Sequence, residues 1–278
     1  MADEWITGNF KLRIHGEPIE MQVTVPTAKV KPQRMLPLFQ EMASTVVDQC
    51  VAVVESEGKK VSCKAGCGAC CRQAVPISEI EAYHIAEIVN EMPPERQAII
   101  RKRFADALAH FRKIKWFDEL IGLKDMAYEG SPEFSAEKYA EVITKYMKQG
   151  YACPFLEDES CSIHKDRPAV CREYLVTSPA ENCADPRADT IKKVPIYLRP
   201  SKALLKLGKT ETTENWSSVI MIEALDLVEK NPDRLEEKTG PEWTEEFFNA
   251  LASTEKILKD DPAPSRRRKK PRHSRKGR

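Results

Sequence analysis

Seven of the nine cysteines in this 278-residue chain fall into two short blocks. The first block, CKAGCGACC, places four cysteines in residues 63–71, and the second, CPFLEDESCSIHKDRPAVC, places three in residues 153–171. Cysteine thiolate is a donor that zinc and iron–sulfur clusters prefer, and a metal needs several such donors around one point. Close spacing favours this arrangement, because few backbone torsions separate neighbouring donors. The two blocks therefore predict a metal site.

The cysteines are expected to be thiols. The opening MADEWITGNF has neither the basic region nor the apolar region of a signal peptide, and no apolar run is long enough to span a bilayer. We therefore expect a cytoplasmic protein without membrane association, in which clustered cysteines indicate metal binding more than disulfides. Cys50 stands apart in a helix-like stretch and is expected to be a small buried hydrophobe. The eight candidate ligands are Cys63, Cys67, Cys70, Cys71, Cys153, Cys161, Cys171 and Cys183.

The first block has features of a metal-binding knuckle. Gly66 and Gly68 flank Cys67, where we expect a tight turn with positive φ and room for backbone beside a metal. Lys64 and Arg72 place positive charge near the thiols, and such neighbours lower the pKa of a thiol.

Cys70 and Cys71 are adjacent in the sequence. Neighbouring side chains diverge, so this pair is poorly suited to chelating one mononuclear ion. The two thiols could bridge or serve two metals, or one could be a spectator. We favour a site with more than one metal, or a cluster.

The second block predicts a short hairpin, because the polar middle of PFLEDES resembles a turn and would bring Cys153 and Cys161 side by side. Pro168 is expected at the first position of a helical turn that aims Cys171 back at the site. His164 is a possible nitrogen donor, although eight thiols could already suffice.

Two arginines of the second block, Arg167 and Arg172, are expected to hydrogen-bond the thiolates or to offset their charge. Four thiolates around a divalent ion carry a net charge of about −2, so positively charged neighbours matter for such a site.

The elements that must position these residues are mostly helical. Residues 9–25 alternate between apolar and polar around HGEP and predict a β-hairpin. Ser78 and Glu81 form a predicted capping box before a helix that Pro93-Pro94 ends. The predicted helices cover residues 34–57, 79–92, 94–114, 136–149, 215–229 and 243–257.

The predicted fold is mainly α with a small N-terminal β-hairpin, in which a helical domain is organised around a cysteine-rich metal site. We expect a hairpin segment at 1–32, the helical metal-binding domain at 33–258 and a disordered basic tail at 259–278. The fold must bring the two cysteine blocks together. A metal held between them would crosslink the ends of the helical insert and contribute to folding.

The motifs resemble a known family. CKAGCGACC followed by CPFL, CSIH, RP and CREY resembles the YkgJ-type cysteine-cluster proteins, described as a zinc- or iron-chelating domain, over about residues 60–185. The resemblance implies that zinc or an iron–sulfur cluster binds at the seven block cysteines, with Cys183 where members often carry a last cysteine. A related branch contains flagellin lysine methylases.

Three functions follow as hypotheses. The first is metal binding in a structural, carrier or electron-transfer role. The second is an iron–sulfur enzyme, for example in methyl transfer or redox chemistry. The third is a nucleic-acid-associated zinc protein, because residues 262–278 contain nine Lys and Arg and no acidic residue and could bind RNA, DNA or an acidic protein. The sequence shows no glycine-rich nucleotide-binding loop outside the first cysteine block.

Overall fold

The N-terminal segment is an antiparallel hairpin of β1 (Trp5–Ile14) and β2 (Glu17–Pro26) in the computed structural model, which describes residues 4–14, 17–186, 189–207 and 218–254. Phe10 lies opposite Met21 and Leu12 lies opposite Ile19, as the alternating pattern requires. The hairpin prediction is therefore confirmed, although its expected turn includes residues 15 and 16, which lie outside the described residues.

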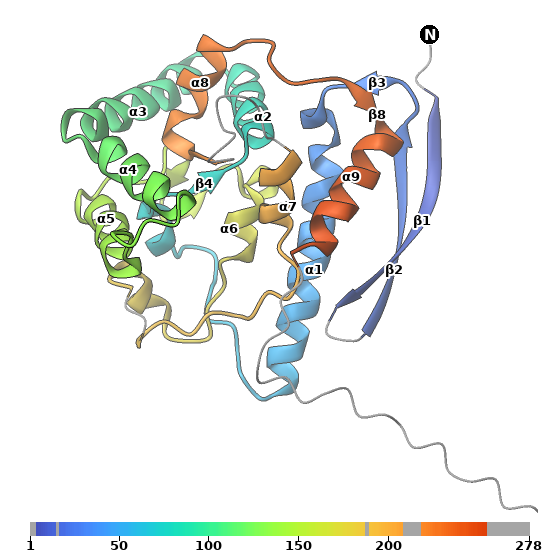
Figure 1. Cartoon of the computed structure of the whole chain (residues 1–278), viewed down its shortest axis with the longest axis horizontal. Helices are drawn as coiled ribbons and strands as arrows, with labels where there is room; N and C mark the ends of the chain where they lie inside the picture. Colours follow the sequence, from blue (N-terminus) through green and yellow to red (C-terminus); the bar gives the residue numbers. More distant parts are fainter. Residues whose placement is uncertain (1–3, 15–16, 187–188, 208–217, 255–278) are drawn as a thin grey trace, which may run out of the picture.

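A long helix, α1 (Leu36–Ser56), follows the 3-10 turn η1 (Pro32–Met35) and packs beside the hairpin and α9 (Gly240–Ala252), as Figure 1 shows. Phe39 of α1 stacks on Phe247 of α9, with ring centroids 4.2 Å apart. Cys50 is fully buried in this core, as predicted. The helix ends before Gly58, whose φ of 78° belongs to the left-handed region that glycine adopts readily.

A second group of helices covers the opposite side of the molecule (Figure 1). The capping box of Ser78 and Glu81 begins α2, as predicted, and the α3 stripe of Ile100, Phe104, Leu108 and Phe111 is buried, as predicted. Ser135 caps α5, as predicted. The helices of this group are α2 (Glu79–Asn90), α3 (Pro94–Lys113), α4 (Trp116–Tyr128), α5 (Ala136–Lys148) and α8 (Ala224–Lys230).

Two helices were not predicted, namely α4 and α7 (Pro200–Leu207). Helix α4 follows α3 with neither glycine nor proline between them. The chain instead changes direction at Lys115, which takes a left-handed conformation with φ of 56°. The boundary therefore lacked its usual sequence signal.

The prediction of one helix over residues 215–229 was wrong at residues 219–223, and residues 215–217 lie outside the described part of the chain. Val219–Ile220 form β7, which pairs antiparallel with β4 (Pro76–Ile77), and the 3-10 turn η6 (Met221–Glu223) leads into α8. Tertiary pairing with the segment after the first cysteine block overrides the helical pattern here. The predicted helix at 243–257 begins earlier, at Gly240, where Thr239 provides a capping box.

Short elements carry most of the cysteines. They are η2 (Ala69–Arg72), β5 (Leu156–Glu157), β6 (Ser160–Cys161), η3 (His164–Asp166), α6 (Ala169–Glu173) and η4 (Ala180–Ala184). A further short pair joins β3 (Lys29–Val30) to β8 (Lys238–Thr239).

The predicted fold class, mainly α with a small N-terminal hairpin, is confirmed. No helix in the described part of the chain is both long and apolar enough to cross a membrane. The predicted basic tail, residues 262–278, lies outside the described residues.

Candidate metal centre

The first cysteine block forms a tight turn that leads into η2. The backbone N–H of Cys67 donates to the carbonyl of Lys64 at 3.2 Å, and Gly66 has a φ of 78°. The expected positive φ is confirmed at Gly66 but is wrong at Gly68, which has a φ of −89°. A Cβ at Gly68 would come within 2.5 Å of the Glu159 carboxylate and 2.8 Å of Leu156. A side chain at position 68 would therefore displace the ends of these two second-block side chains.

The two blocks are in direct contact. The backbone N–H of Cys153 donates to the carbonyl of Cys71 at 2.6 Å. Arg72 forms a two-pronged ion pair with Glu159, with nitrogen–oxygen distances of 2.6 and 3.0 Å. The fold thus brings together segments that the long helical insert separates in sequence, as the metal-site hypothesis requires.

The second block contains the predicted hairpin, formed by β5 and β6. Cys161 lies directly opposite Leu156, while Cys153 precedes the turn, so the two cysteines are close without being register partners. Pro168 occupies the N-cap of α6, one residue before its expected place, and the backbone N–H of Cys171 donates to its carbonyl at 3.0 Å.

The three second-block thiols pack against one side of the apolar core. Cys153, Cys161 and Cys171 all pack against the core formed largely by α2 and α3 together with Phe155. The sulfur of Cys153 also lies 3.6 Å from the sulfur of Met221. These contacts shield one side of the thiols from water.

Cys183 joins the site from η4, which packs against η2. Its side chain is buried, and its charge interacts with those of Cys63, Cys67 and Cys70. The hydroxyl of Tyr174 hydrogen-bonds the Cys183 sulfur. The cysteine expected from the family resemblance is therefore near the first block.

Burial raises the pKa of most of these thiols. It raises the pKa of Cys153 to about 12, and it also raises the pKa of Cys63, Cys161, Cys171 and Cys183. A bound metal ion supplies the positive charge that favours the thiolate form. The burial therefore disfavours free thiolates while leaving the donors suited to a metal.

Cys70 and Cys71 behave as a hydrogen-bonded pair. The Cys71 thiol donates to Cys70 and lowers the pKa of Cys70 to about 7, while the same bond raises the pKa of Cys71. Cys70 is consequently the thiol of this pair that ionises first.

The positive charge of Arg167 lowers the pKa of thiols in both blocks. Burial raises the pKa of Cys63 and Cys161, and the positive charge of Arg167 partly opposes that effect at both thiols. The buried Nε of Arg167 has no hydrogen-bond partner among the described residues. The expectation that Arg167 offsets thiolate charge is supported.

The other predicted cations differ in role. Arg172 also offsets thiolate charge, because its positive charge lowers the pKa of Cys161. It hydrogen-bonds the hydroxyl of Ser44 at 3.0 Å and the carbonyl of Arg167 at 3.1 Å as well, and these bonds hold the loop before α6 in place. Lys64 is exposed, and Arg72 is engaged mainly by Glu159. His164, the possible nitrogen donor, is exposed on η3.

Two buried carboxylates hold α6 in place, and the sequence patterns did not predict that they belong to the site. Glu81 accepts a hydrogen bond from the Ala169 N–H at the start of α6. Glu173, at its end, accepts from the Ser201 N–H at 2.6 Å and from Arg199 at 2.7 Å. The capping box identified Glu81 as a helix cap, but no sequence signal indicated the contact with α6.

The donor chemistry fits zinc or an iron–sulfur cluster, because all eight candidate ligands are free thiols and their charges interact across the blocks. Among the described residues, which include every cysteine, no three Cys, His, Asp or Glu side chains are arranged to hold one ion. The sulfur atoms would therefore have to draw together when a metal binds.

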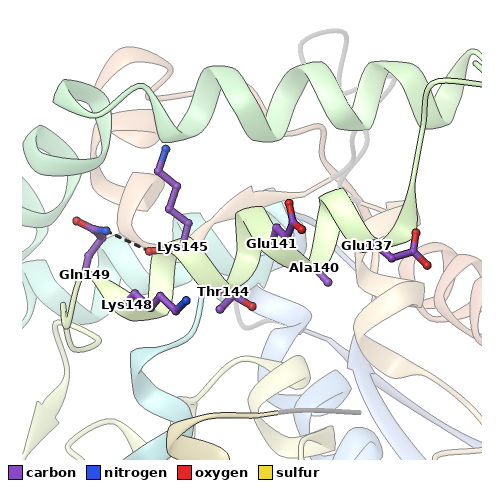
Figure 2. Close-up of a pocket in the computed structure, with 7 residues that line it drawn as sticks. All are labelled: Glu137, Ala140, Glu141, Thr144, Lys145, Lys148 and Gln149. Carbon is purple, nitrogen blue, oxygen red and sulfur yellow. Dashed lines mark hydrogen bonds between the residues drawn. The ribbon is translucent and has the colours of Figure 1, made fainter.

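An open groove lies elsewhere, along α5 (Figure 2). Its seven lining residues run from Glu137 to Gln149, whose side-chain amide donates to the carbonyl of Lys145 at 3.3 Å. The groove contains no cysteine, so it is not part of the thiol site.

The helical fold and the partly buried group of thiols define a cysteine-rich domain. Residues 62–194 match the model of the CxxCxxCC family, whose description is "Putative zinc- or iron-chelating domain". This match covers both cysteine blocks and Cys183, and it agrees with the resemblance of the motifs. The comparisons with curated proteins and with solved structures found no match.

Proposed function

We propose that this protein binds zinc or an iron–sulfur cluster through cysteines of both blocks and Cys183, in a structural, carrier or electron-transfer role. The observation that carries the proposal is the direct contact of the blocks, in which the Cys153 N–H donates to the Cys71 carbonyl at 2.6 Å. The eight ligands would be Cys63, Cys67, Cys70, Cys71, Cys153, Cys161, Cys171 and Cys183.

The surroundings support metal ligation over packing alone. A thiol that serves only as a small hydrophobe belongs in an apolar core, as Cys50 does. The clustered thiols instead lie close enough that their thiolate forms would repel one another, and Arg167 lies close enough to offset part of that charge. Gathering so many ionisable donors is unfavourable unless a cation offsets their charge.

The thiol form of the cysteines fits a reducing compartment, and we place the protein in the cytoplasm as part of the proposal. There, zinc or iron could reach the site without competing disulfide formation.

The test is anaerobic purification followed by measurement of zinc, iron and acid-labile sulfide per chain. A colourless protein with stoichiometric zinc would support a structural or carrier role. A brown protein with iron and sulfide would support electron transfer or cluster-dependent chemistry. Protein that contains neither metal, and takes up neither under reducing conditions, would refute the proposal.

A further inference from the structure

We propose that the eight thiols divide into two sets of four and that each set forms its own metal site. The proposal rests on the proposed metal binding and specifies which thiols share a site. The first set is Cys63, Cys67, Cys70 and Cys183. The second set is Cys71, Cys153, Cys161 and Cys171.

The division begins at Cys70 and Cys71, which lie next to each other on η2. A 3-10 helix has three residues per turn, so neighbouring side chains leave it about 120° apart. The two thiols approach each other closely enough to hydrogen-bond, but they start from different sides of the 3-10 helix, so each can face a different ion. They are well placed to serve as adjacent corners of two neighbouring sites.

The first set surrounds the turn at Gly66. That turn lies between Cys63 and Cys67 and leads into η2, and the 3-10 helix η4, which carries Cys183, packs against η2. The Cys63 charge interacts with those of Cys67 and Cys70, and the Cys183 charge interacts with all three. These four residues form a mutually interacting group without any residue of the second block.

The second set lies against the apolar core. Cys153 is joined to Cys71 through the backbone hydrogen bond of 2.6 Å, and the β5–β6 hairpin places Cys161 near Cys153. The Cys71 charge interacts with those of Cys153 and Cys171, and the Cys171 charge interacts with those of Cys153 and Cys161. The three second-block thiols of this set pack against the same apolar core.

The boundary between the sets is occupied by Cys70 and Arg167. The charge of Cys70 also reaches the second set, as expected for a residue adjacent to Cys71. The guanidinium of Arg167 interacts with Cys63 of the first set and Cys161 of the second. Two divalent ions with four thiolates each carry about −2 per site, so a shared cation reduces the repulsion between sites.

The experiment uses cadmium as a probe, because this ion binds thiolates and gives an NMR signal that depends on its ligands. The full-length reduced protein, freed of metal, is titrated with cadmium and followed by metal analysis and cadmium NMR. We expect two bound ions per chain and two resonances in the range of four-thiolate coordination.

Two matched variants assign the resonances. Cys183→His and Cys161→His each retain a metal-binding side chain, so they test the site without deleting a ligand. Cys183→His should shift one resonance strongly, and Cys161→His should shift the other. Cys50→Ala, at the cysteine outside both sets, should leave both resonances in place. Circular dichroism confirms that each variant is folded.

The outcomes separate this inference from the proposed function. Two resonances that respond to different variants support the two sets. A single thiolate-bound cadmium ion, or two resonances that shift strongly together in both variants, would overturn the division but leave metal binding intact. Folded wild-type protein that binds no cadmium through thiolates would overturn both.

Discussion

The carboxylate of Glu81 accepts a hydrogen bond from the backbone N–H of Ala169 at 2.8 Å, which ties α2 to the short helix carrying Cys171. Its other oxygen accepts from the backbone N–H of Ser78 at 2.8 Å and from the Ser78 hydroxyl at 3.0 Å. A helix as short as α6 has little stability of its own. The position of Cys171 therefore depends on this buried carboxylate and on Glu173 at the other end of the helix.

Replacing Glu81 with alanine should destabilise the protein and weaken metal binding. The change leaves the buried N–H groups of Ser78 and Ala169 without their acceptor, and we expect a loss of about 2–4 kcal/mol in the free energy of unfolding. Urea denaturation measures the loss. Glu91→Ala, at the exposed end of the same helix, is the control and should change stability by less than about 0.5 kcal/mol. Equal effects of the two variants would contradict the positioning role.

The pH dependence of stability should contain a contribution from Glu81. Burial raises the pKa of Glu81, so above its ordinary value the folded state retains a proton that the unfolded state has lost. This contribution is fully present below the unfolded pKa of about 4.3 and is lost as the pH rises through the folded pKa. The stability of Glu81→Gln relative to wild type should therefore increase with pH across this window. A difference that stays constant in urea denaturation from pH 4 to pH 8 would refute it.

Gly66 should tolerate asparagine better than alanine. No atom lies within 4 Å of a Cβ built at Gly66, so the cost of a substitution comes from its φ of 78°. We expect Gly66→Ala to lose about 1–2 kcal/mol of stability. Gly66→Asn should lose less, because asparagine visits the left-handed region more often. Thermal denaturation and cadmium affinity of both variants provide the measurement, and equal losses would argue against backbone strain as the cause.

In metal-free, reduced protein, Cys70 should be alkylated more readily than its neighbour Cys71. Hydrogen bonding from Cys71 lowers the pKa of Cys70 to about 7, so Cys70 should become a thiolate, and react with iodoacetamide, as the pH rises through this value. Cys71→Ala removes the donor and should move the reaction to higher pH, whereas Cys71→Ser retains a donor and should move it less. Peptide mass spectrometry at a series of pH values measures the rates. Preferential labelling of Cys71 in the wild type would contradict the assignment.

Metal removal should lower the melting temperature. A metal that binds only the folded chain at about one hundred times its dissociation constant adds about 2.7 kcal/mol of stability. For a protein of this size that corresponds to a shift of roughly 5–10 °C. Differential scanning calorimetry with and without a chelator, under reducing conditions, measures the change, and added zinc or iron should reverse it. An unchanged melting temperature in demonstrably metal-depleted protein would show that metal binding is not coupled to folding.

Local sequence patterns determined much of the secondary structure. The alternation around Phe10 and Leu12 identified the hairpin, and Ser78 with Glu81 identified the start of α2. These features depend on neighbouring residues, because strand alternation and helix capping act over a few positions. Where a local signal was missing, as between α3 and α4, the helix boundary was missed as well.

The sequence by itself also determined the chemistry of the candidate site, because eight clustered thiols favour soft metal ions whatever their exact arrangement. Only the tertiary structure decided which residues meet: it showed that Gly68 accommodates Glu159 and Leu156, and that Arg167 acts on thiols of both blocks. These contacts join segments far apart in the chain. They arise from the packing of the helices between the blocks, and no short-range pattern records that packing.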